Sequence, residues 1–61
     1  FMESKYTGMT VNERLYVSGL IDIFYKSVEG KNTEEVRLIL KKIEIEDEAS
    51  IRDILHHLEL Q

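Results

Sequence analysis

The residues best suited to chemistry are two adjacent histidines, His56 and His57. Successive residues of a helix point about 100° apart, so this pair cannot converge on one metal ion. Asp53 and His57 are four residues apart and would share a helix face, but protein zinc sites use three or four ligands. A symmetric dimer would supply two further ligands from the second copy. We interpret both histidines as solvated residues near a helix C-terminus, where the helix dipole favours positive charge, and we expect no metal.

Four carboxylates cluster in one short stretch, at Glu44, Glu46, Asp47 and Glu48. Catalytic carboxylates need a cleft that shifts their pKa values, and a chain of 61 residues rarely builds one. Acidic residues are favourable at the start of a helix, so we expect Asp47 to be an N-cap. The alternative is that Glu46, Asp47 and Glu48 form a binding surface for a basic partner, where complementary charge would speed association.

Nucleophilic catalysis has no support in the sequence. The chain has no cysteine, which excludes thiol chemistry, disulfides and thiolate metal sites. The serines lie outside any nucleophile-elbow motif, and the three glycines are scattered rather than gathered into a phosphate-binding loop. We therefore expect no enzyme activity, no cofactor and no small-molecule substrate.

The charge balance bears on the class of partner. The formal net charge is −4, which disfavours nucleic acid and anionic membranes, because both are bound mainly through lysine and arginine. A DNA-binding helix-turn-helix remains an alternative only because such modules can be this small. No apolar run has the length of a transmembrane helix or the order of a signal peptide. We expect a cytoplasmic protein whose partner is another protein or a second copy of itself.

Capping residues and apolar spacing predict an all-α fold with three helices. The first covers about residues 11–29, because Thr10 and Glu13 have capping-box spacing and Gly30 stands where a left-handed residue would end the helix. The apolar residues at helical spacing that form its main stripe are Val17, Leu20, Ile21, Phe24 and Val28.

The second helix opens at Asn32 or Thr33 and ends in basic residues near Lys42. The third follows Asp47 and includes an expected ion pair between Glu48 and Arg52. Their apolar stripes are Val36, Ile39, Leu40 and Ile43 in the second helix, and Ile51, Ile54, Leu55 and Leu58 in the third. Short connections predict a compact three-helix bundle over residues 10–61. We expect residues 1–9 to be flexible or foreign to the native chain, with the native start at Met2 or Met9.

Residues 36–45 (VRLILKKIEI) and 51–60 (IRDILHHLEL) align without gaps at an offset of 15. Either the two segments descend from one duplicated helix, or two amphipathic helices of similar design resemble each other by chance. Known helical repeats contain both helices of a hairpin, so a repeat of one helix predicts no familiar solenoid.

The helix expected at 11–29 carries more apolar residues than one face needs. Tyr16 and Ile23 widen its apolar arc beyond about 100°, and Gly19 between them would let another backbone approach closely. Either the other helices cover this face within the monomer, or it is exposed and binds a partner. We predict a protein–protein interaction module that uses Tyr16, Gly19 and Ile23.

Two alternative functions stay open. A homo-oligomer would close a dimer core with the same face. An immunity-type or antitoxin-type inhibitor would cover the basic active site of a toxic nuclease with Glu46, Asp47 and Glu48.

Residues 12–24 (NERLYVSGLIDIF), followed by VRLILKKIEI, resemble a group of short uncharacterised bacterial proteins that begin near NERLYVSGL and end soon after a second ILKK-type helix. The resemblance covers the chain from about Met9 onward. It implies no activity and no binding residues, and it favours Met9 as the native start.

Overall fold

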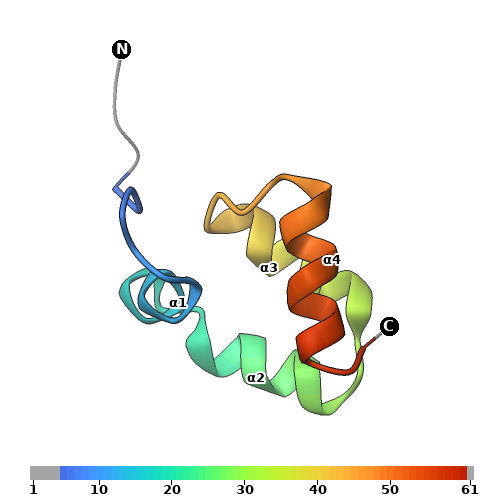
Figure 1. The fold of residues 1–61 in the computed structure, drawn as a ribbon. Coiled ribbons are helices and arrows are strands. Elements are labelled where there is room, and N and C mark those ends of the chain that lie inside the picture. The colour runs from blue at the N-terminus through green and yellow to red at the C-terminus, as the bar shows by residue number, and fades with distance from the viewer. Residues whose placement is uncertain (1–4, 61) are drawn as a thin grey trace.

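The computed structural model describes residues 5–60, which contain four α-helices and no strand. The helices are α1 (Val11–Ser18), α2 (Ile21–Glu29), α3 (Thr33–Lys42) and α4 (Glu48–His57) (Figure 1). The expected all-α class is confirmed for this part of the chain. The expected three-helix bundle is wrong, because the helix predicted at 11–29 is two helices.

The break between α1 and α2 lies at Gly19, whose φ of +78° is left-handed. The Gly19 N–H donates to the carbonyl of Tyr16, and the Leu20 N–H donates to the carbonyl of Leu15 at 3.1 Å, which is a Schellman helix ending. A Cβ placed at Gly19 would meet nothing within 4 Å. Within the described chain this glycine therefore serves the left-handed backbone, and close approach of a partner's backbone to it stays a prediction.

The break also changes which side chains are buried. Leu15 is 1% exposed and belongs to the core, whereas Val17, which we placed in the main apolar stripe, is 54% exposed. Phe24 of α2 is buried as expected. A left-handed residue resets the helix direction, so the spacing counted across Gly19 no longer places residues on one face.

The other three helices end in the same way, but without glycine at the left-handed position. Gly30 has a φ of −81°, so the prediction that it ends the helix in a left-handed conformation is wrong. The following residue takes that role, and the left-handed residues after α2, α3 and α4 are Lys31, Glu44 and Glu59, with φ of 55°, 70° and 60°. Non-glycine residues in this region are uncommon, so these three endings are held by the rest of the fold.

The 15-residue repeat is a repeat of one structural unit. Asn32 before α3 and Asp47 before α4 are N-caps, each accepting the backbone N–H three residues later. Glu44 and Glu59 are the left-handed residues that follow the two helices. Each is followed by an apolar residue that packs against the core, namely Ile45 and Leu60. Equivalent parts of the two units are thus 15 residues apart.

The helices follow one another in an open arrangement (Figure 1). Cα atoms approach within 8 Å between α1 and α2, between α2 and α3, and between α3 and α4, but α4 has no such approach to α1 or α2. Side chains from all four helices and from the segment before α1 form the core, which comprises Tyr6, Leu15, Phe24, Val36, Ile39, Leu40, Ile43, Ile51 and Leu55.

Arg14 of α1 connects the segment before α1 to the end of α3. Nη1 of Arg14 donates to the carbonyl of Ile43 at 3.0 Å, at the end of α3, and Nε of Arg14 donates to the carbonyl of Met9 at 3.2 Å. The guanidinium also lies over the ring of Tyr6, and Tyr6 is 5% exposed. Within the segment that we expected to be flexible or foreign, Tyr6 therefore belongs to the core, whereas residues 1–4 lie outside the described residues.

Candidate functional site

Exposed apolar side chains gather on the first two helices. Among residues 5–60, four of the five large exposed apolar residues lie on α1 and α2, namely Tyr16 (76% exposed), Val17 (54%), Tyr25 (49%) and Ile23 (48%), and the fifth is Leu38 of α3. We call the first four the α1–α2 surface. The prediction that Tyr16 and Ile23 stand outside the core agrees with these values, and the alternative that the other helices cover them is wrong. Gly19 lies between them as the turn that joins the two helices.

Two members of the α1–α2 surface were missed in the sequence. The spacing places Val17 in the core stripe only if the helix continues through Gly19, which it does not. Tyr25 is outside the apolar stripe, and its position beside α1 follows only from the turn: its hydroxyl donates to Oδ1 of Asn12 at 3.3 Å. The signal that was available is the Ser18-Gly19 pair, since a glycine often marks a helix C-terminus.

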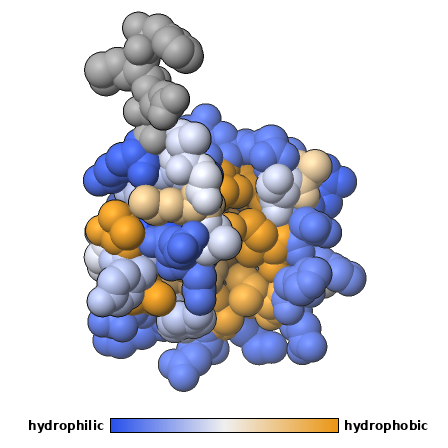
Figure 2. All heavy atoms as spheres, turned by 60° about the vertical axis from the view of Figure 1, so that its left-hand side comes forward, coloured by the Kyte–Doolittle hydropathy of each residue, from blue (hydrophilic) through white to orange (hydrophobic). Residues whose placement is uncertain are grey.

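An apolar groove of about 470 Å³ lies beside this surface, between α1, α2 and the second half of α4. Figure 2 shows the hollow as an apolar area in the middle of the face, with hydrophilic side chains around it. Its apolar lining residues are Val11, Leu15, Phe24, Ile54 and Leu58, and its polar ones are Thr10, Asn12, Tyr25, Asp53 and His57. The volume falls in the usual range for ligand sites, about 300–1,000 Å³.

The groove exists because the backbone of α4 stays away from that of α1 and α2. Over residues 5–60, its lining contains one carboxylate, that of Asp53, and no lysine or arginine. The spacing of Asp53 and His57 places them on one helix face, but it does not indicate a groove. The groove depends on how helices far apart in the chain are placed, and no local pattern of residues reports that.

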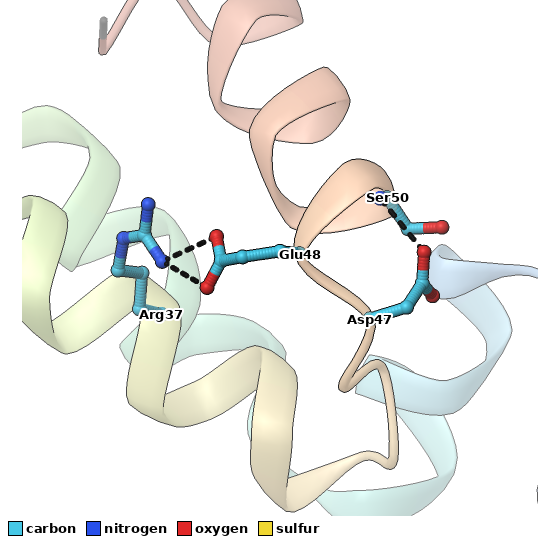
Figure 3. Close-up of polar contacts among 4 residues, drawn as sticks. All are labelled: Arg37, Asp47, Glu48 and Ser50. Atoms are coloured by element: carbon cyan, nitrogen blue, oxygen red, sulfur yellow. Dashed lines mark hydrogen bonds and ion pairs between the residues drawn. The ribbon is translucent and has the colours of Figure 1, made fainter.

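The acidic run has roles within the fold, as Figure 3 shows. The Glu48 carboxylate accepts two hydrogen bonds from Nη1 of Arg37, both at 3.0 Å, and so joins α4 to α3. The expected partner of Glu48 was Arg52, so that prediction is wrong. Asp47 accepts the N–H of Ser50 at 3.0 Å, and this backbone hydrogen bond lowers the pKa of the Asp47 carboxyl below its usual value of 3.8. Glu46 is exposed.

The histidines occupy separate surroundings. His56 and His57 are both exposed in the last turn of α4, and His57 lines the groove while His56 lines a smaller hollow with Ala49 and Arg52. Among residues 5–60, no group of three or more histidine, cysteine, aspartate or glutamate side chains could hold a metal ion. Over the same residues, no helix combines the length and apolar character required to cross a membrane.

No family model, curated protein or solved structure matches this chain. The resemblance to short bacterial proteins therefore stays a prediction.

Proposed function

We propose that this protein is a non-catalytic module that binds another polypeptide through the α1–α2 surface. The observation that carries the proposal is the concentration of exposed Tyr16, Val17, Ile23 and Tyr25 on two consecutive helices of a small chain. Exposed apolar patches commonly mark interaction sites, and tyrosine is among the residues enriched where binding energy is concentrated. Full burial of one such side chain contributes roughly 1.5–3 kcal/mol.

Gly19 supports this surface without contacting a partner through a side chain. Its left-handed turn sets the angle between α1 and α2, and so fixes where Tyr16 and Ile23 stand relative to each other. We expect a partner to recognise that arrangement, as rigid elements position binding residues better than flexible ones.

The acidic residues are not part of the surface that we propose. Asp47 caps α4 and Glu48 pairs with Arg37, so both carboxylates have partners within the fold, and Glu46 alone would be a weak basis for recognising a basic toxin. All three side chains are exposed, so the inhibitor alternative stays a prediction, and the α1–α2 surface is the site that we propose.

Self-association is the second candidate, because the same four side chains could close a symmetric dimer. A chain of this length buries only about 60% of the surface that its unfolded form exposes, so a dimer would add needed burial. The charge argues against a dimer, because each copy has a net charge of −4 and like charges oppose association. Light scattering across a wide concentration range distinguishes the two candidates: a monomer at all concentrations excludes the dimer.

The test of the proposal is photo-crosslinking in the cells that produce the protein. A photoreactive residue is placed at Tyr16, at Ile23 or, as a control, at Glu34, which is exposed at the start of α3. We expect adducts of one defined mass from the first two positions and none from the third. Equal adducts from all three positions, or none from Tyr16 and Ile23, would contradict the proposal.

A further inference from the structure

We infer that the groove between α1 and α4 binds an amphipathic helix that places a lysine or arginine against Asp53. The inference rests on the proposed function in one respect, that the partner is a polypeptide. It concerns a neighbouring site that shares only Tyr25 with the α1–α2 surface, since the groove is otherwise lined by residues such as Val11, Ile54 and Asp53 and not by Tyr16 or Ile23.

The shape of the fold favours a helix as the occupant. Among the four helices, Cα atoms of α1 come within 8 Å only of α2, and those of α4 only of α3. The groove lies between α1 and α4, whose side chains meet in the core but whose backbones stay apart. Helices pack with their axes about 8–10 Å apart, and a helix laid in the groove would contact α1 on one side and α4 on the other. Insertion of an amphipathic helix into an apolar groove is a common mode of peptide recognition.

The apolar lining specifies one face of that helix. Val11, Ile54 and Leu58 are half-buried, whereas Leu15 and Phe24 lie deeper and are nearly inaccessible. Apolar side chains at positions i, i+3 or i+4, and i+7 of the bound helix would share the face that enters the groove. They would cover the half-buried residues, which remain partly in contact with water in the free protein.

The charge of the groove specifies the other face. Among the described residues, Asp53 is the one carboxylate of the lining, which contains no lysine or arginine, and the formal net charge of the whole chain is −4. A basic helix is complementary to this charge, whereas an acidic one, including a helix from a second copy of this chain, is opposed by it.

The test starts from a random library of about 16-residue peptides displayed on phage and selected on the full chain; this length gives four to five helical turns. We expect the enriched peptides to share apolar residues at helical spacing with a lysine or arginine beside them. Binding of these peptides should weaken about tenfold with Asp53→Lys. Glu29→Lys makes the same change in net charge at an exposed residue outside the groove, and it should change affinity less than about twofold. Circular dichroism establishes that both variants remain folded.

The site is located by the methyl resonances of Val11, Ile54 and Ile23 in NMR titrations with an enriched peptide. Shifts at Val11 and Ile54, without shifts at Ile23, support the groove. Shifts at Ile23 alone would overturn the inference and leave the α1–α2 surface as the binding site. Equal losses from Asp53→Lys and Glu29→Lys, enrichment of acidic peptides, or no enrichment at all would also overturn it. Crosslinking from Tyr16 would still decide the proposed function in each of these cases.

Discussion

The two halves of the molecule reach the same helical structure by different means. In the second half, α3 and α4 repeat one unit, with an N-cap side chain before each helix, and a left-handed glutamate and an apolar residue after it. An ion pair between Arg37 and Glu48 links the two units. In the first half, a side-chain cap precedes α1 but not α2, and the two helices meet at the left-handed turn of Gly19.

The halves also differ in what they do with apolar residues. In α3 and α4 most of them are buried, and Leu38 is the one large apolar residue of these helices that is strongly exposed. In α1 and α2 four such residues are exposed. The comparison indicates that the second half chiefly supplies the core, whereas the first half contributes less to stability than its apolar content suggests and leaves a surface for binding.

The largest effect that would test this division comes from side-chain truncation. Leu55→Ala removes a fully buried side chain of α4, and we expect the free energy of unfolding to fall by about 2–5 kcal/mol. Ile23→Ala in α2 should lower it by less than about 1 kcal/mol, because that side chain is half exposed in the folded state. Urea unfolding followed by circular dichroism measures both. Similar decreases in the free energy of unfolding of the two variants would contradict the proposed difference between the two halves.

The two glycines provide a matched pair in the first half. Gly19→Ala forces a side chain into a left-handed backbone, and we expect it to destabilise the protein by about 1–2 kcal/mol. Gly30→Ala has an ordinary φ, and its Cβ would meet only ordinary contacts, the nearest being the Lys26 carbonyl at 3.5 Å. It should be neutral or slightly stabilising. Differential scanning calorimetry of the two variants makes the comparison, and a stable Gly19→Ala would show that α1 and α2 do not require this turn.

The left-handed glutamates of the second half should respond in the opposite direction. Glu44→Gly relieves a residue with φ of 70°, and we expect a stabilisation of about 0.5 kcal/mol, since the relief of backbone strain exceeds the added entropy of the unfolded chain. Glu46→Gly is the control, because no positive φ occurs at that position, and it should destabilise. Loss of stability in Glu44→Gly would mean that its side chain has a role that its backbone does not explain.

The smallest effect is a difference in pH dependence between the two repeated units. Asp47 accepts a backbone N–H that holds its pKa below 3.8, so its contribution to stability is present above that pH and is lost as pH falls through the lowered value. The equivalent cap of α3 is Asn32, which does not titrate. Asp47→Asn should therefore flatten the acid limb of the stability curve, measured by urea unfolding from neutral pH to about pH 3. An unchanged curve would show that Asp47 does not contribute to it.

Local signals in the sequence were sufficient for much of the fold. The capping box is formed, with the Glu13 N–H donating to Oγ1 of Thr10 and the Thr10 N–H donating to Oε1 of Glu13. The caps at Asn32 and Asp47 and the core-facing stripes of α3 and α4 follow from the sequence for the same reason: each depends on residues within about four positions of one another.

The errors have a common physical origin. Gly19 and Gly30 both stand near a helix end, and only their surroundings decide that the first is left-handed and the second is not. At the second site Lys31 takes the left-handed conformation, which no propensity would predict. The candidate site was predicted in part, since Tyr16 and Ile23 are exposed, whereas the groove requires the placement of α4 relative to α1, which residue spacing does not contain.

The hydrogen bonds of Arg14 have a consequence for how the chain folds. Most of the architecture joins each helix to the next one along the chain, and folds with such local contacts form quickly. The bond from Arg14 of α1 to Ile43 instead spans 29 residues, so it closes a loop that includes all of α2 and α3. Because loop closure costs entropy before its contacts form, we expect the docking of α1 onto the end of α3 to occur late in the folding reaction.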